Sequence, residues 1–112
     1  MQSRFFTVVL CAAFLGGMSA PAGLQAEGDK DAGRAKAESC LGCHGIEGYR
    51  NAYPSYRVPK VGGQTETYLI AALKAYRSGD RAHPTMRAQG AGLSDEDIED
   101  IAAYLAAADG AE

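Results

Sequence analysis

Tryptophan is absent from this 112-residue chain, and its three phenylalanines, Phe5, Phe6 and Phe14, all lie near the N-terminus. Residues 27–112 therefore have no aromatic side chains other than six tyrosines. A domain of about 86 residues is near the size at which a side-chain core alone gives marginal stability, and small domains commonly recruit a metal or a cross-link. The composition predicts that an added group completes the core.

Long apolar runs are also missing. The longest, residues 5–15, is about half of the roughly 20 residues that a membrane-spanning helix needs, and glycine and proline interrupt the residues that follow it. With Arg4 before it and small residues ending at Ala26, this run is typical of a Sec-type secretory signal peptide. We predict a signal peptide at residues 1–26, one domain at residues 27–112, a periplasmic location, and no permanent membrane anchor after cleavage.

Cysteine is scarce as well, because loss of Cys11 with the signal peptide leaves only Cys40 and Cys43. These two lie in the sequence CLGCH, residues 40–44, which has the spacing that attaches a c-type haem. Two thiols separated by two residues can add to the two vinyl groups of one porphyrin, and the histidine directly after them falls beneath the iron. We predict one haem c attached through Cys40 and Cys43, with His44 as an axial ligand.

Two other interpretations of the paired cysteines remain open. A plain disulfide is compatible with export, although a thioredoxin-like redox site expects the cysteines at the start of a helix that follows a strand. A helix is expected before Cys40 instead. Zinc needs about four ligands, and His83 lies far beyond zinc-finger spacing from Cys43. Haem attachment is the preferred interpretation.

Two helices are predicted in the first part of the domain. Residues 29–40 are rich in alanine, and aspartates at their start can cap a helix. Gly33 costs about 1 kcal/mol there relative to alanine, so it suggests close approach by another helix or ring. Residues 66–77 form the second helix, with Thr65 as a possible N-cap and Gly79 just beyond its end. One face of it carries a stripe of Tyr68, Leu69, Ala72 and Tyr76.

A third helix begins at Ser94, where Asp97 completes an acidic variant of the capping box, and ends near Asp109. Residues 45–64 and 78–93 are predicted to be loops. The first is long and rich in glycine and proline, which is typical of a segment that wraps a cofactor. Its tyrosines are expected to cover the haem: Tyr49, Tyr53 and Tyr56. The chain has no strand alternation and no internal repeat, so the predicted class is all-α, with three to five helices around the haem.

The iron of an electron carrier takes a second strong axial ligand. Once Met1 and Met18 are lost with the signal peptide, Met86 is the one methionine left, and it is the preferred candidate. His83 is the competing candidate and would give a lower reduction potential. A third possibility is an open five-coordinate iron, which would favour gas binding or peroxidase chemistry.

Together these pieces resemble the class I monohaem bacterial cytochromes c, the small periplasmic electron carriers, and the single domains of their dihaem relatives. The likeness spans roughly residues 28–107. It rests on ordered matches: CLGCHG at 40–45, PKVGGQ at 59–64, YL at 68–69, the loop at 81–86, and LSDEDI at 93–98 followed by AAY at 102–104. Between residues 45 and 59 the chain departs from the family in size and polarity.

The resemblance implies a role for each matching position. Cys40 and Cys43 would form the thioethers, and His44 and Met86 would be the axial ligands. The Pro59 carbonyl would accept a hydrogen bond from the His44 ring, which would fix the tautomer of the ring.

The same resemblance implies an arrangement of the helices. Gly33 would let the first helix cross the last one near Tyr104.

Charge is unevenly distributed over residues 27–112, which hold 10 Lys and Arg against 14 Asp and Glu. Residues 45–91 contain seven basic and three acidic side chains, whereas residues 92–112 contain seven acidic and none basic. Such a distribution can orient an exposed haem edge toward an acidic patch on a redox partner. An acidic domain without a concentrated basic helix gives no support for nucleic-acid binding.

The function predicted from these features is a periplasmic one-electron carrier with His/Met axial ligation. We expect a monomer that serves redox protein partners and is not itself an enzyme, since no catalytic constellation is present. Two alternatives remain: an electron-accepting haem subunit of a periplasmic dehydrogenase complex, and a haem protein with an open distal site for gas or peroxide.

Overall fold

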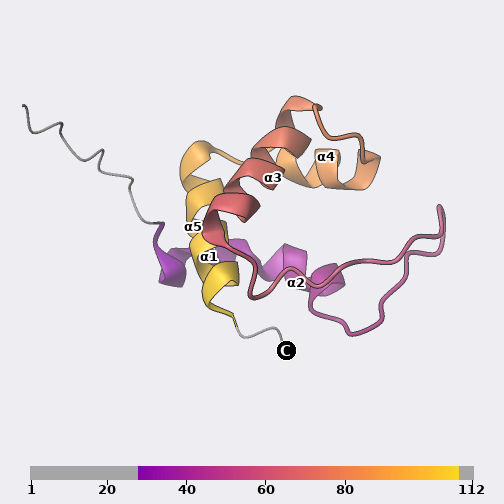
Figure 1. The fold of residues 1–112 in the computed structure, drawn as a ribbon, viewed down its shortest axis with the longest axis horizontal. Coiled ribbons are helices and arrows are strands. Elements are labelled where there is room, and N and C mark those ends of the chain that lie inside the picture. The colour runs from indigo at the N-terminus through magenta and orange to yellow at the C-terminus, as the bar shows by residue number, and fades with distance from the viewer. Residues whose placement is uncertain (1–27, 109–112) are drawn as a thin grey trace, which may run out of the picture.

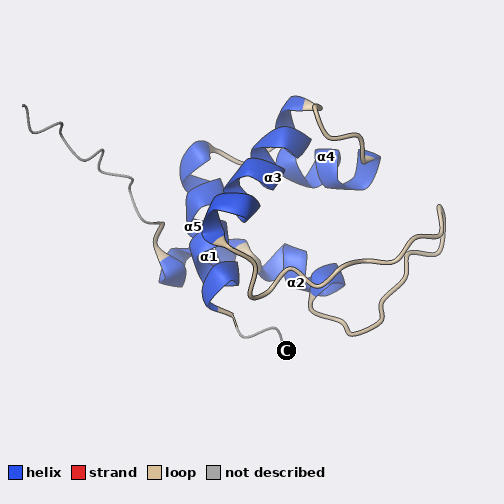
Figure 2. Cartoon of the chain, viewed as in Figure 1, coloured by secondary structure: helices blue, strands red, loops and turns tan. Residues whose placement is uncertain are grey.

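The structure, a computed structural model, describes residues 28–108, whose regular elements are all helices (Figures 1 and 2). In chain order they are α1 (Lys30–Lys36), α2 (Glu38–His44), α3 (Glu66–Ser78), α4 (Pro84–Gly90) and α5 (Asp95–Ala107). The predicted all-α class is confirmed. The predicted signal peptide and the Asp109 helix end lie outside the described residues. No helix within residues 28–108 has the length and apolar character needed to cross a membrane.

The sequence predicts one helix at residues 29–40, but the structure has two helices there, which are separated at Ala37. Asp29 caps α1 as expected, because its side chain accepts hydrogen bonds from the backbone of Asp31 at 2.9 Å and Ala32 at 3.2 Å. At Ala37 ψ is −4°, far from the helical value of about −42°. Ala37 is fully buried in the core, so tertiary packing overrides its strong helix propensity. The second helix then continues to His44.

The predicted helix at residues 66–77 is confirmed as α3. The Thr65 side chain accepts a hydrogen bond from the Tyr68 N–H at 3.3 Å and caps its start. Gly79 follows Ser78 with φ of 91°, a left-handed conformation that glycine adopts without strain.

The prediction of a loop throughout residues 78–93 is wrong, because α4 forms within it. His83 is its N-cap, and its ring Nδ1 accepts a hydrogen bond from the Met86 N–H at 3.3 Å. Pro84 occupies the first helical position, where its fixed φ suits a helix and no N–H partner is needed.

The crossing of α1 and α5 depends on Gly33. A Cβ at this position would overlap the backbone carbonyl of Asp100 and would lie 2.9 Å from the Cβ of Tyr104. The expected close approach near Tyr104 is therefore present. The capping box predicted at the start of α5 is also confirmed: the Asp97 N–H donates to Ser94 Oγ at 3.0 Å, and the Ser94 N–H donates to Asp97 Oδ2 at 2.9 Å.

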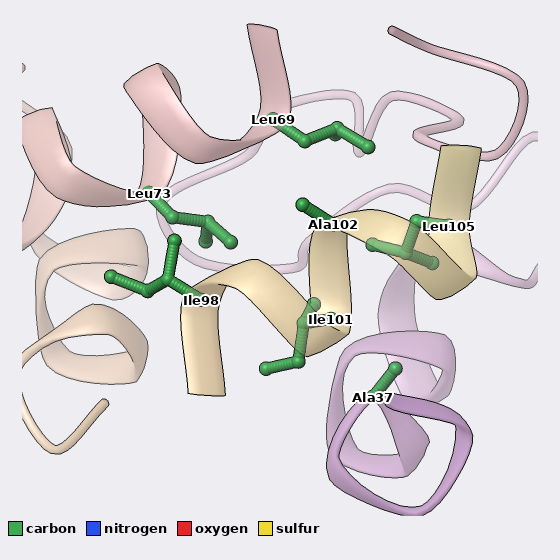
Figure 3. Packing of buried hydrophobic residues seen from close by; sticks show 7 residues of the cluster. All are labelled: Ala37, Leu69, Leu73, Ile98, Ile101, Ala102 and Leu105. Atoms are coloured by element: carbon green, nitrogen blue, oxygen red, sulfur yellow. The ribbon is translucent and has the colours of Figure 1, made fainter. Parts of the chain in front are cut away.

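The core forms around α5, which packs against both α1 and α3 (Figure 3). Ile98 and Ile101 are its largest fully buried side chains. They pack in one cluster with Ala37, Leu69, Leu73, Ala102 and Leu105. Helix α4 joins this body through α3. The segment of residues 45–64, called the 45–64 segment below, runs out from the end of α2 and returns to the start of α3 (Figure 1).

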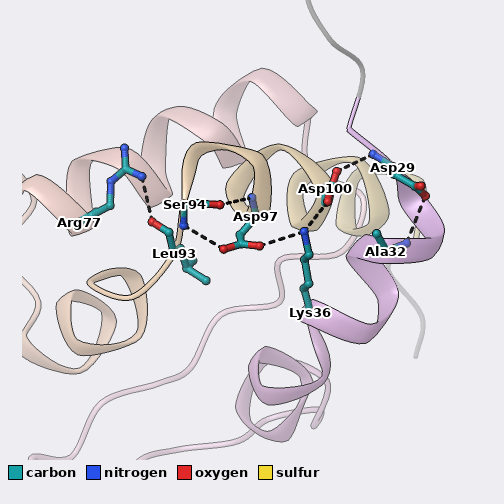
Figure 4. A network of polar contacts seen from close by, with 8 residues as sticks. All are labelled: Asp29, Ala32, Lys36, Arg77, Leu93, Ser94, Asp97 and Asp100. Atoms are coloured by element: carbon teal, nitrogen blue, oxygen red, sulfur yellow. Dashed lines mark hydrogen bonds and ion pairs between the residues drawn. The ribbon is translucent and has the colours of Figure 1, made fainter.

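A polar network joins α1 to α5 (Figure 4). Lys36 Nζ lies 2.6 Å from Asp100 Oδ2 and 2.9 Å from Asp97 Oδ1. The other oxygen of the buried Asp100 carboxylate accepts the Asp29 N–H at 2.7 Å. The hydrogen bond from Lys36 lowers the pKa of Asp100. The Ser94 backbone N–H, followed by Lys36, lowers the pKa of Asp97 to about 2.

Replacing Gly33 with alanine tests the α1–α5 crossing. We expect Gly33→Ala to lower the free energy of unfolding by about 1–3 kcal/mol, because overlap with α5 outweighs the better helix propensity of alanine. Gly42→Ala is the matched control, since it is also helical and its new Cβ would meet nothing within 4 Å. Denaturant unfolding followed by circular dichroism measures both. Equal stability of the two variants would contradict the packing role of Gly33.

Replacing Lys36 with methionine tests the polar network. Lys36→Met leaves the buried Asp100 without its cation, so we expect a lower thermal midpoint at neutral pH. The pKa of Asp97 is held at about 2, below its ordinary value of 3.8, so the stability this carboxylate contributes is present above about pH 4 and is lost as the pH falls toward about 2. Thermal unfolding of wild type and variant across that range should therefore converge. A constant difference would show that ionisation of this network does not stabilise the fold.

Candidate functional site

A cavity of about 370 Å³ lies between α2 and α4, and α3, α5 and the 45–64 segment complete its lining. Helices α2 and α4 stand apart in Figure 1 and do not pack on each other. The volume falls within the range of about 300–1,000 Å³ that is typical of small-molecule and cofactor sites.

The two thiols and the histidine of the CLGCH sequence line this cavity from α2. Cys43 and His44 lie three and four residues after Cys40, and residues three or four apart share a helix face. Both cysteines are free thiols; Cys40 is half-buried and Cys43 is exposed. Burial raises the pKa of the Cys40 thiol.

The ring of His44 is oriented by the backbone of the 45–64 segment. Its Nδ1 lies 2.6 Å from the carbonyl oxygen of Pro59. A carbonyl can only accept, so Nδ1 carries a proton and donates, and in the neutral ring Nε2 is then the nitrogen with the lone pair. Pro59 lines the cavity as well. The geometry therefore leaves His44 one free nitrogen with metal-binding character.

Met86 and His83 line the same cavity from the start of α4. Met86 is half-buried and packs against the core cluster. Because His83 Nδ1 caps α4, its proton lies on Nε2. The His83 ring also makes edge-on contacts with Tyr56, at 4.8 Å between ring centroids, and with Tyr76, at 6.2 Å. The structure thus brings all five predicted site residues, and His83, to one cavity.

The tyrosines of the 45–64 segment divide into two groups. Tyr49 and Tyr56 line the cavity, whereas Tyr53 does not and is 94% exposed. The expectation that Tyr53 covers the haem surface is therefore wrong. The 45–64 segment turns back on itself at residues 50–57, which carries the Tyr53 ring into solvent.

Apolar side chains form much of the remaining wall. The stripe predicted on α3 lies here in full, since Tyr68, Leu69, Ala72 and Tyr76 all line the cavity. Other apolar lining residues are Val58, Val61, Leu73, Ile101 and Leu105. The helical period identified the stripe, but the wall residues contributed by the 45–64 segment have no period that could have revealed them.

Two guanidinium groups, from Arg57 and Arg81, are the charged side chains of the lining, and among the described residues no Asp or Glu joins them. Arg81 donates to the Tyr68 hydroxyl at 3.3 Å and lies 4.7 Å from the centroid of the Tyr76 ring. The sequence showed excess positive charge in residues 45–91, but it did not show that these two groups face a cavity.

The cavity fits a haem. It places two thiols and an oriented histidine on one side and a thioether on the other, with apolar walls between them. Its two arginines, without an acidic neighbour in the lining, suit a group that carries carboxylates.

Comparisons with known proteins agree with this geometry. The sequence model of the cytochrome c family matches residues 30–109. The chain is 50% identical over 82 residues to cytochrome c-554(548) of Halomonas halodenitrificans, an alignment that covers 69% of this chain and 93% of that protein. It is 42% identical over 81 residues to cytochrome c4 of Pseudomonas aeruginosa, covering 72% of this chain and 39% of that one.

Solved structures of cytochrome c4 share the fold. The reduced recombinant protein of Pseudomonas stutzeri aligns with a TM-score of 0.51 and 32% identity, covering 62% of this chain and 38% of that one. The Acidithiobacillus ferrooxidans protein aligns with a TM-score of 0.53 and 26% identity, covering 73% and 52%. The chain thus spans about half or less of these two cytochromes c4 but nearly all of cytochrome c-554(548). It belongs to the cytochrome c family, as a class I bacterial cytochrome c and hence a haem-containing electron-transfer protein.

Proposed function

We propose that this protein is a periplasmic one-electron carrier that holds a single haem c in the cavity between α2 and α4. Thioethers from Cys40 and Cys43 attach the haem, and His44 and Met86 are its axial ligands. The observation that carries the proposal is the convergence of these four side chains on one cavity, although α2 and α4 do not pack together. When bound, the haem supplies a reversible one-electron couple between ferric and ferrous iron.

The residues around the ligands keep their geometry constant. The Pro59 carbonyl, 2.6 Å from His44 Nδ1, holds the imidazole in one tautomer and one orientation and makes Nε2 a better donor. Helix α4 presents Met86 from its first turn, which the His83 side chain caps. Two fixed strong ligands leave little room for substrate and change little between oxidation states, as electron transfer requires.

The wall of the cavity sets the surroundings of the redox centre. Leu69, Leu73 and the α5 side chains Ile101 and Leu105 exclude water from one side. An apolar, poorly hydrated environment and a methionine ligand both favour the ferrous state and raise the reduction potential. Arg57 and Arg81 supply positive charge for the haem carboxylates.

The partners we propose are other redox proteins, met by a monomer in the periplasm after loss of residues 1–26. The excess of basic side chains in residues 45–91, which contribute most of the cavity lining, suits encounter with an acidic surface.

Substitution of Met86 tests the axial ligand. In Met86→Ala the ferric protein should lose its methionine-sulfur absorption band near the red end of the spectrum, its reduction potential should fall, and its ferrous form should bind carbon monoxide. His83→Asn is the control, because asparagine preserves an N-cap for α4 but removes the imidazole; it should retain the band. Persistence of the band in Met86→Ala, or its loss in His83→Asn alone, would contradict this assignment.

The covalent attachment and export are tested together by mass spectrometry of the protein recovered from the periplasm. We expect the mass of residues 27–112 plus one haem, and a pyridine haemochrome spectrum typical of two thioethers. Cys40→Ser should remove one thioether and shift that spectrum, whereas Cys11→Ser should leave haem content unchanged because Cys11 is cleaved away. Haem loss in Cys11→Ser, or a mature protein that keeps residues 1–26, would overturn this part of the proposal.

A further inference from the structure

We propose that Tyr56 keeps Met86, the second axial ligand, on the iron, a role called the latch below. By binding the residue next to Met86, Tyr56 ties the 45–64 segment to the first turn of α4. The inference rests on the proposed His44/Met86 ligation and adds to it a positioning residue outside the ligand set.

The contact spans two parts of the chain that are distant in sequence. The Tyr56 hydroxyl donates to Thr85 Oγ1 at 2.8 Å, and Thr85 immediately precedes Met86. The Tyr56 ring meets the His83 ring edge-on at 4.8 Å, with an angle of 79° between the ring planes. Tyr56 thus contacts Thr85, the residue before Met86. It also contacts His83, the N-cap of α4, whose ring accepts the Met86 N–H.

The latch is anchored at its other end. Residues 49–58 fold back on themselves: the Asn51 N–H donates to the Tyr56 carbonyl at 2.9 Å, and the Val58 N–H donates to the Tyr49 carbonyl at 3.0 Å. An antiparallel bridge pairs Arg50 with Arg57 between these two bonds. Tyr56 is therefore held by backbone hydrogen bonds on its own side of the cavity.

Helix α4 needs such support. It has seven residues, far below the length of about 12 to 15 at which an isolated helix is even marginally stable in water. Among the described helices it contacts α3 alone, and on that side the Tyr76 ring lies 6.2 Å from the His83 ring. Tyr56 makes the matching contact from the 45–64 segment. The start of α4 is thus held from two sides, and loss of the Tyr56 side leaves Met86 freer to dissociate.

The effect should be local to the ligand. Thr85 is exposed and Tyr56 is half-buried, so the hydrogen bond lies outside the core cluster, and its loss should change global stability little. Dissociation of Met86, in contrast, opens the iron to an added ligand. The net free energy that an ordinary hydrogen bond contributes corresponds to a change of roughly two- to tenfold in the equilibrium constant for dissociation of Met86 from the iron.

The test measures how tightly imidazole, a competitor of the methionine sulfur, binds the ferric holoprotein. We expect Tyr56→Phe to bind imidazole roughly two- to tenfold more tightly than wild type, with an unchanged thermal unfolding midpoint. Tyr53→Phe is the matched control, since it removes the same hydroxyl from the exposed ring of the same segment; its imidazole affinity should equal that of wild type.

The partner hydroxyl is tested in the same assay. Thr85→Val should raise the imidazole affinity as Tyr56→Phe does, Thr85→Ser should restore the wild-type value, and the double variant Tyr56→Phe/Thr85→Val should bind no more tightly than either single variant. Independent, multiplicative effects would show that the two hydroxyls do not act through one bond. Equal affinities of Tyr56→Phe and Tyr53→Phe would overturn the latch while leaving Met86 ligation intact.

Failure of the ligation itself has a different signature. If wild-type ferric protein lacks the methionine-sulfur band, or if Met86→Ala binds imidazole no more tightly than wild type, then Met86 is not the ligand. The latch would then have nothing to hold, and both proposals would fall.

Discussion

The close crossing of α1 and α5 at Gly33 is the contact on which the rest of the molecule depends. No side chain separates the two helices there, so the buried Asp100 reaches both Lys36 and the Asp29 N–H. Helix α1 leads directly into α2 through the buried Ala37, and α5 also supports α3, which in turn supports α4. The two sides of the cavity are therefore placed by one shared helix, although they do not touch each other.

This arrangement explains how so small a domain manages with so few large side chains. Leu69, Leu73, Ile101 and Leu105 belong to the core cluster and to the cavity wall at once. These four side chains are buried, and a haem in the cavity would cover the apolar surface that the rest of the wall leaves exposed. The sequence has few large aromatic residues, and the cavity lies where a bound haem would supply apolar surface in their place.

Sequence patterns predicted the parts of this fold that depend on neighbours along the chain. The caps at Asp29, Thr65 and Ser94 are local signals, and the structure places each as expected. The missed features depend on distant contacts. The bend at Ala37 follows from burial in the core, and the ring of His83, an unusual N-cap, is held by tyrosines from two other segments.

The candidate site shows the same division. Residues with distinctive chemistry, such as Met86, could be proposed from their scarcity, whereas the roles of Arg57, Arg81 and Tyr56 could be inferred only once the structure showed the cavity.

The central claim, a haem closed on both faces by the protein, is tested most directly by exposing the reduced wild-type holoprotein to carbon monoxide and recording its absorption spectrum. We predict an unchanged spectrum. A carbon monoxide complex forming readily in the native protein would contradict the account.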